Sequence, residues 1–162
     1  MVSSINDTRG LTREFGNLET FIMWSYLDSS GDIRRAADKV LWENSERTGK
    51  SRGFSYDSLL GFQCTQDVFD AIAVELDASF GVRGKSAENN KWARFEDALF
   101  RAAELAGIST EEDSLYDVCT WFLAFAMERV NFRRIVEKHF ENYEYDVESN
   151  TLKLRDSDIG EP

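Results

Sequence analysis

The sequence is poor in the residues that build metal sites and disulfide frameworks. It has one histidine, two cysteines and one proline among 162 residues. One histidine and two distant cysteines, Cys64 and Cys119, do not make up any of the usual zinc ligand sets. The cysteines lie in apolar surroundings without Cys-x-x-Cys spacing, so we expect buried, reduced thiols in a cytoplasmic protein. No metal and no cofactor is expected from this pattern.

The sequence also lacks a long apolar run and a targeting segment. The two most apolar stretches, residues 21–27 and 118–127, are much shorter than the ~20 residues that a membrane-spanning helix needs. The N-terminal residues have neither the basic start nor the apolar core of a signal peptide. These absences predict a soluble cytoplasmic protein that does not insert into a membrane.

Positive charge is scarce. The chain has 19 Lys and Arg against 30 Asp and Glu, a net charge of −11. Residues 109–162 hold 6 basic and 13 acidic residues, so this last third carries −7. A surface of this sign repels nucleic-acid phosphates and attracts basic proteins. We therefore expect a basic protein as partner and no direct DNA binding.

What the sequence does contain is helical periodicity. Apolar residues recur at steps of three and four in five or six segments, which predicts a mainly α, single-domain helical bundle. The first predicted helix covers residues 11–27. Residues 143–147 and 151–154 alternate with period two and predict a small C-terminal β-hairpin or an extended tail. The predicted domain covers residues 11–155, between a flexible N-terminus at residues 1–10 and a flexible tail at residues 156–162.

The most apolar predicted helix runs from Ser109 to about Tyr143, as one helix or two nearly collinear ones. Ser109-Thr-Glu-Glu112 has the pattern of a capping box at its start. The apolar run from residue 118 to residue 127 indicates a central position in the core. We expect four aromatic side chains, Trp121, Phe122, Phe125 and Phe132, to be largely buried against Phe21, Ile22, Phe69, Ile72, Trp92 and Leu99.

Acidic residues and tyrosines are interleaved near the C-terminus. Carboxylates around tyrosine rings are typical of a surface that docks on a basic partner, because the rings supply contact area and the charges speed association. We predict an acidic binding or inhibitor protein that occludes a basic surface, as antitoxins, immunity proteins and nucleic-acid mimics do. The candidate partner-binding residues are Glu137, Glu141, Tyr143, Glu144, Tyr145, Asp146 and Glu148.

Arg134 and His139 have the spacing Arg-x4-His. This spacing resembles the motif of HEPN-type ribonucleases, which are small all-α proteins, although Ile135 stands where that family commonly carries a polar residue. The resemblance implies an alternative function, a metal-independent endoribonuclease. In it Arg134 binds phosphate and His139 transfers a proton across a homodimer cleft.

The helical spacing itself does not favour that catalytic role. On one straight helix the side chains of Arg134 and His139 point ~140° apart. They can therefore cooperate only across a dimer or a bend, and no catalytic residue is favoured by the sequence. A helical scaffold or phage structural subunit is the third interpretation, and the oligomeric state stays open.

Overall fold

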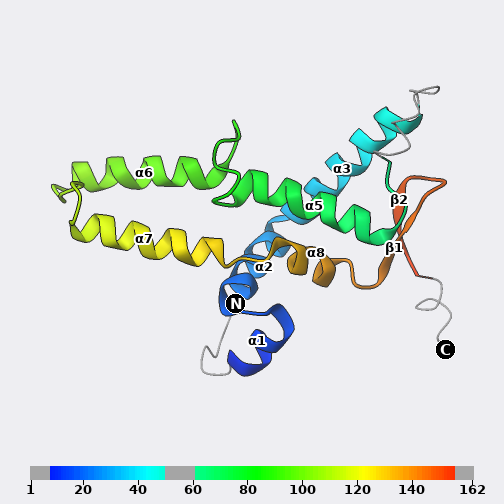
Figure 1. Ribbon diagram of the computed structural model, residues 1–162, viewed down its shortest axis with the longest axis horizontal. Coiled ribbons are helices and arrows are strands. Elements are labelled where there is room, and N and C mark those ends of the chain that lie inside the picture. Colours follow the sequence, from blue (N-terminus) through cyan, green and yellow to red (C-terminus); the bar gives the residue numbers. More distant parts are fainter. Residues whose placement is uncertain (1–7, 50–60, 156–162) are drawn as a thin grey trace. The chain divides into compact units, whose positions relative to one another are not determined.

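The computed structural model describes residues 8–49 and 61–155 of the chain. These residues are mainly α-helical and end in a two-stranded antiparallel sheet, which confirms the predicted fold class (Figure 1). The predicted flexible termini fall outside the described ranges except for residues 8–10. The elements are α1 (Thr8–Phe15), α2 (Leu18–Ser30), α3 (Asp32–Gly49), α5 (Thr65–Phe80), α6 (Lys91–Leu105), α7 (Leu115–Glu128), α8 (Phe132–His139), β1 (Tyr143–Asp146) and β2 (Thr151–Leu154).

Residues 11–155, for which the sequence predicts a single domain, divide into two compact units. Unit 1 takes in the described residues of Met1–Met23 and Leu76–Phe132. Unit 2 takes in those of Trp24–Glu75 and Arg133–Pro162. The boundaries fall inside α2 and α5 and after the first residue of α8, so each of these helices contributes residues to both units.

Two of the predicted helices are each divided in the structure. The first breaks at Gly16, whose φ of +89° is a left-handed conformation that glycine adopts without strain. The second, Ser109 to Tyr143, is replaced by α7 and α8 with a break at residues 129–131. At this break the side chain of Asn17 donates to the carbonyl oxygen of Arg129 at 2.8 Å. The hydroxyl of Thr20 accepts the N–H of Asn131 at 3.0 Å, so side chains from an earlier helix satisfy the backbone groups that a continuous helix would pair.

The connection between α6 and α7 also differs from the predicted capping box. Gly107 ends the turn after α6 with a φ of +77°. Ser114 is the N-cap of α7, because its side chain accepts the N–H of Asp117 at 3.2 Å. The Ser109 hydroxyl, six positions before α7 begins at Leu115, instead accepts the N–H of Glu111. The prediction that Ser109 and Glu112 cap the helix is therefore wrong.

The prediction of a buried α7 is also wrong. Trp121, Phe122 and Phe125 are 57%, 71% and 63% exposed, and α7 has no buried residue. Of the four aromatic side chains expected in the core, only Phe132 is buried. The physical reason is that α7 packs on α6 along one side, while its apolar residues occur on both sides.

The cysteines are exposed as well, contrary to the expectation of buried thiols. Cys64 lies just before α5, and Cys119 lies on α7. Cys119 shares the exposed side of α7 with Phe122, which explains its exposure despite apolar neighbours in sequence. Both thiols are free.

Unit 2 holds a well-buried apolar core. Its helices contribute fully buried side chains from the end of α2, from α3, from the start of α5 and from α8. These are Leu27, Ile33, Val68, Ile72, Ile135, Val136 and Phe140. The ring of Phe140 stacks on that of Phe69 with centroids 6.0 Å apart. The hairpin pairs Tyr143 with Leu154 and Tyr145 with Leu152, as the alternation predicts.

No helix among residues 8–49 and 61–155 is both long and apolar enough to cross a membrane.

A buried asparagine joins α5 to α6 within unit 1. Asn90 is 1% exposed and is the N-cap of α6, accepting the N–H of Ala93 at 2.9 Å. Its amide nitrogen donates to the carbonyl oxygens of Ala78 at 2.7 Å and Gly81 at 3.0 Å. One side chain therefore provides hydrogen-bond partners for an N–H at the start of α6 and for two carbonyl oxygens at the end of α5.

Replacement of Asn90 by alanine should lower the free energy of unfolding by about 2–4 kcal/mol, because a cap is lost and two buried carbonyl groups lose their donor. Asn90→Ser should fall between wild type and alanine, since serine keeps the cap but not both donated bonds. Asn89→Ala, at an exposed neighbour, should change the value by less than about 0.5 kcal/mol. Urea unfolding measures all three, and equal stability of Asn90→Ala and Asn89→Ala would contradict the assignment.

Candidate functional site

Tyr145, one of the predicted partner-binding residues, lies inside unit 2. It is 9% exposed, and its hydroxyl donates to the side-chain oxygen of Asn150 at 2.8 Å. The amide of Asn44 on α3 donates to the same hydroxyl at 3.1 Å, and the N–H of Tyr145 donates to the hydroxyl of Thr65 at 3.0 Å. Burial raises the pKa of this phenol. Tyr145 thus fixes the β-hairpin to α3 and α5, and it has little surface to offer a partner.

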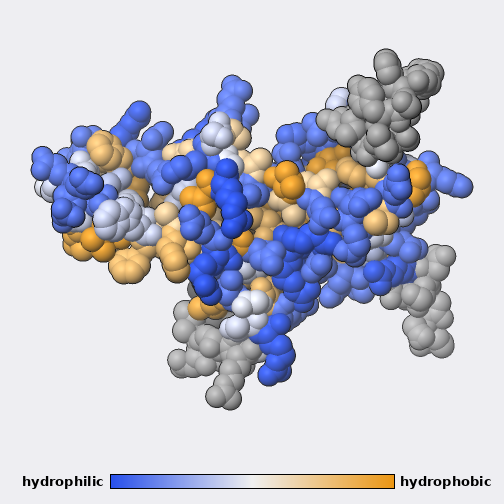
Figure 2. All heavy atoms as spheres, in the orientation of Figure 1, coloured by the Kyte–Doolittle hydropathy of each residue, from blue (hydrophilic) through white to orange (hydrophobic). Residues whose placement is uncertain are grey.

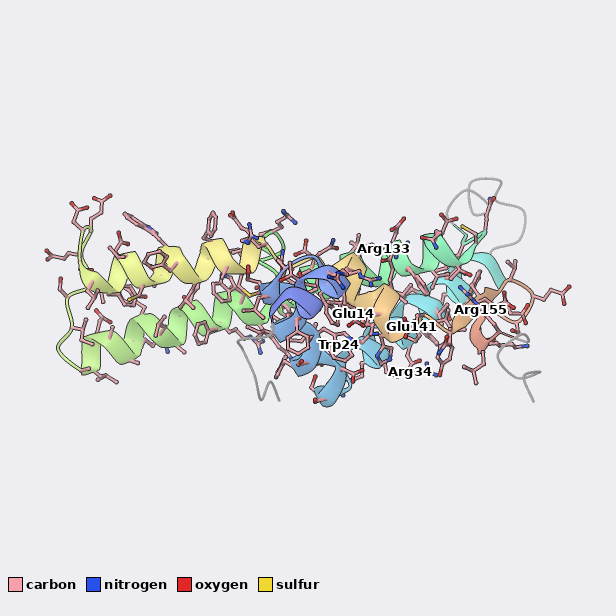
Figure 3. All side chains as sticks on the ribbon, turned by 90° about the horizontal axis from the view of Figure 1, so that it is seen from below. Glu14, Trp24, Arg34, Arg133, Glu141 and Arg155 are labelled. Atoms are coloured by element: carbon pink, nitrogen blue, oxygen red, sulfur yellow. The ribbon has the colours of Figure 1, made fainter. Side chains whose placement is uncertain are left out.

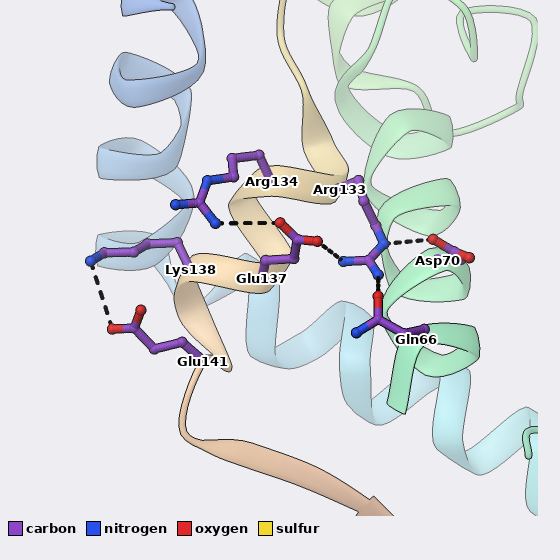
Figure 4. Close-up of polar contacts among 7 residues, drawn as sticks. All are labelled: Gln66, Asp70, Arg133, Arg134, Glu137, Lys138 and Glu141. Carbon is purple, nitrogen blue, oxygen red and sulfur yellow. Dashed lines mark hydrogen bonds and ion pairs between the residues drawn. The ribbon is translucent and has the colours of Figure 1, made fainter. Parts of the chain in front are cut away.

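Three of the five predicted partner-binding carboxylates are paired with cations of the same segment. Glu137 lies between Arg133, at 2.8 Å, and Arg134, at 3.3 Å (Figure 4). Lys138 lies 3.7 Å from Glu141.

The third pair is in the β-hairpin, where Lys153 lies 2.9 Å from Asp146. The hydroxyl of Ser149 donates to the Asp146 carboxylate at 2.6 Å, and this bond together with Lys153 lowers the pKa of that carboxyl. Residues 133–155 hold five acidic and five basic residues in total, so this stretch has no excess of negative charge.

The remaining predicted residues are more accessible. Glu144 and Glu148 are exposed, and no ion pair within the described part of the chain involves them. Tyr143 is partly exposed, and its ring packs edge-on against Phe140 with centroids 5.4 Å apart. The predicted acidic surface is therefore reduced to two carboxylates beside one half-covered ring.

Arg133, which the sequence does not single out, makes the most contacts in this region. It lies 2.5 Å from Asp70 and donates to the side chain of Gln66, both on α5 (Figure 4). Its guanidinium lies over the ring of Phe69 at 5.3 Å and also pairs with Glu137. These contacts fasten α8 to α5, which is a structural role.

Arg134 and His139, the residues of the ribonuclease alternative, have different partners. Arg134 pairs with Glu137 on its own helix. His139 lies with Nδ1 2.8 Å from a carboxylate oxygen of Asp28 on α2, and its ring packs edge-on against Phe140. Glu137 and Asp28 are thus different carboxylates on different helices, one beside each side chain. This arrangement provides no observation that favours phosphate binding or proton transfer.

A groove of about 300 Å³ lies between α3 and α5 in unit 2. Its lining is half apolar, with Val40, Phe62 and Val74, and carries the carboxylates of Glu43 and Glu75. Glu75 accepts a 2.7 Å bond from Lys39, which raises the pKa of that lysine. Within residues 8–49 and 61–155, no group of three or more His, Cys, Asp or Glu could hold a metal ion.

The end of the α6–α7 hairpin where the helices connect is both acidic and apolar. We call this end the acidic tip and define it by four exposed acids and three exposed aliphatic side chains. The acids are Glu104, Glu111, Glu112 and Asp113, and the aliphatic residues are Leu105, Ile108 and Leu115. Leu105 is 91% exposed and Leu115 is 76% exposed, so both stand almost fully in water.

Within the described part of the chain, no cation balances the acidic tip. No ion pair among the described residues involves its four acids, and no Lys or Arg occurs in the sequence between Arg101 and Arg129. Loss of solvation and the carboxylates of Glu96 and Asp117, followed by others nearby, raise the pKa of Tyr116 in α7. The gap in basic residues is visible in the sequence and could have revealed this site before the structure did.

The exposed apolar surface continues from the acidic tip along α7. Side chains project from the outer side of α7, away from α6 (Figure 3). In the space-filling view, hydrophobic residues follow the α7 edge of the hairpin (Figure 2). The opposite side of α7 faces α6, where the ring of Tyr116 contacts that of Phe100 with centroids 6.0 Å apart. The hairpin therefore presents a large apolar surface to solvent.

Comparison of the chain with protein-family models, with curated proteins and with solved structures gives no match in any of the three.

Tyr145→Phe should lower the free energy of unfolding by about 1–3 kcal/mol, because Asn44 and Asn150 lose a buried hydroxyl partner. Tyr143→Phe is the matched control and should change it by less than about 0.5 kcal/mol. Urea unfolding of the two variants and wild type makes the comparison. Equal stability of all three would contradict the internal role of the Tyr145 hydroxyl.

Proposed function

We propose that this is an acidic, protein-binding protein of the inhibitor or immunity kind, which docks on a basic surface of a protein partner through the acidic tip. The observation that carries the proposal is the joint exposure of four unpaired carboxylates and three aliphatic side chains in one short segment. The function is the one expected from the overall charge. Its location differs, because the C-terminal acids are largely balanced by neighbouring cations.

The chemistry of the acidic tip suits this kind of docking. Carboxylates without counter-ions produce a negative potential that attracts a basic partner over several ångströms. Exposed aliphatic side chains such as Leu105 and Leu115 then gain free energy when they leave water, at about 25 cal/mol per Å² of apolar surface. Charge therefore governs how fast the complex forms, and apolar burial governs how slowly it dissociates.

The helical hairpin gives the tip a defined shape. Ser114 caps α7, and Gly107 turns the chain after α6, with the N–H of Ile108 bonded to the carbonyl oxygen of Ala103 at 2.9 Å. A connection closed at both ends loses less conformational entropy on binding than a free loop does. This supports the tip as a recognition element.

The first step of the test is to isolate the partner by affinity capture with wild-type protein. Its association is then measured with two double variants that make the same charge change. Glu111→Lys/Glu112→Lys alters the acidic tip, and Glu144→Lys/Glu148→Lys alters the exposed acids of the β-hairpin. The tip variant should associate about 10-fold more slowly at low ionic strength, and the difference should shrink as salt rises.

The hairpin variant should associate nearly as fast as wild type, and both variants should keep the wild-type melting temperature, since the altered side chains are exposed. Slower association of the Glu144→Lys/Glu148→Lys variant alone would move the binding surface to the C-terminal hairpin. Equal rates for all three proteins would remove the acidic tip from recognition altogether.

A further inference from the structure

The outer side of α7 carries a row of apolar residues with the spacing of a helix-pairing interface. Leu115, Val118, Phe122 and Phe125 follow one another at steps of three, four and three, which is the repeat of a coiled-coil contact. Together with Trp121 they fall within an arc of about 120° at 3.6 residues per turn. We call these five residues the α7 face. No charged residue lies between Asp117 and Glu128.

The area of the α7 face approaches what a specific interface between two copies needs. At roughly 200 Å² for an aromatic side chain, the exposed fractions of Trp121, Phe122 and Phe125 leave about 400 Å² of aromatic surface in water. Two copies of the face would bring together about 800 Å² from these rings alone. Leu115, 76% exposed, and Val118 bring the area close to the ~1,000 Å² that specific interfaces exceed.

The distribution of charge along the hairpin selects the orientation of such a pair. The acidic tip lies at the start of α7. The other end of the hairpin carries charges of both signs, because Lys91, Arg94 and Arg129 lie there, and Arg129 is paired with Glu19 at 2.9 Å. Parallel pairing would set one acidic tip against the other. Antiparallel pairing places the two acidic tips at opposite ends and opposes the two helix dipoles, which is the favourable arrangement.

A basic partner suits this face poorly. Cations placed on the α7 face would lose water and find no carboxylate in return, which costs free energy. A second apolar helix has no such cost. The α7 face is therefore best covered by a second α7 face, whereas the acidic tip suits a basic surface.

We propose that the α7 faces of two copies of this chain pack together in an antiparallel, two-fold arrangement centred near Phe122, forming a four-helix bundle from two α6–α7 hairpins. This interface goes beyond the proposed function and does not depend on it. In such a dimer the two acidic tips lie at opposite ends of the bundle, so one dimer can engage two partner molecules.

The mass in solution tests the pairing. Wild-type protein at about 20 µM should sediment with twice the monomer mass of 18.6 kDa. Phe122→Glu should weaken the dimer about 100-fold or more, because the pairing would then bury two carboxylates without partners. Phe122→Ala should weaken it less. The matched control is Trp42→Glu, which places the same charge at a similarly exposed (65%) aromatic position of unit 2 and should leave the dimer intact.

Phe122 is 71% exposed, so the variants should keep the far-ultraviolet circular dichroism of wild type. A monomeric wild-type protein at 100 µM, or a Phe122→Glu protein that dimerises as well as wild type, would overturn the proposal. The Glu111→Lys/Glu112→Lys variant should still dimerise, so a failure of the proposed function and a failure of this inference give different results.

The natural cysteine of α7 reports the orientation. In a Cys64→Ser background, antiparallel pairing centred near Phe122 keeps the two Cys119 residues about six positions apart along the helices, roughly 9 Å. That is beyond disulfide reach. Mild oxidation should therefore leave the dimer non-covalent, and a disulfide-linked dimer in high yield would overturn the antiparallel arrangement.

Discussion

Two helices packed together can bury only the sides that face each other. In the α6–α7 hairpin, α7 has only α6 beside it, although its sequence from Leu115 to Met127 is apolar on both sides. One side is used against α6, and the other keeps Trp121, Phe122 and Phe125 in water. Exposed aromatic surface of this extent costs free energy in a lone chain, which is why we place both proposed contacts of the protein on this hairpin.

Unit 2 shows the contrasting case, in which a cluster of apolar side chains from several helices is fully buried, although single residues such as Trp42 stay exposed. Ile135 and Val136 of the short helix α8 and Phe140 just after it are completely buried, and Arg133 fastens the polar side of α8 to α5. Tyr145 extends the same packing to the β-hairpin. Three of the five carboxylates that made the C-terminal segment look like a docking surface form ion pairs within this unit. Chemistry available for a partner is thus concentrated in the hairpin of unit 1.

Features that depend on residues close together in the sequence could be predicted from it. The alternation around Tyr143 and the turn at Gly107 were visible in the sequence, and both are present. The pairing of Glu137 could also have been foreseen, since Arg133 and Arg134 precede it by four and three residues. The sequence allowed two helices in residues 109–143, but it does not show the contact that caps the break after α7, because Asn17 lies 112 positions from Arg129. Periodicity shows that Phe122 lies on an apolar side of the helix, but it does not show whether another helix packs against that side.

The central claim is that residues 8–49 and 61–155 leave the α7 face uncovered. Hydroxyl-radical footprinting of wild-type protein over a range of concentrations measures this directly, with the fully buried Phe140 as internal reference. We predict fast oxidation of Trp121, Phe122 and Phe125 in dilute protein, protection of the same residues at high concentration, and protection of Phe140 throughout. Protection of the three α7 rings at the lowest concentration would contradict the account, because it would mean that the face is buried within a single chain.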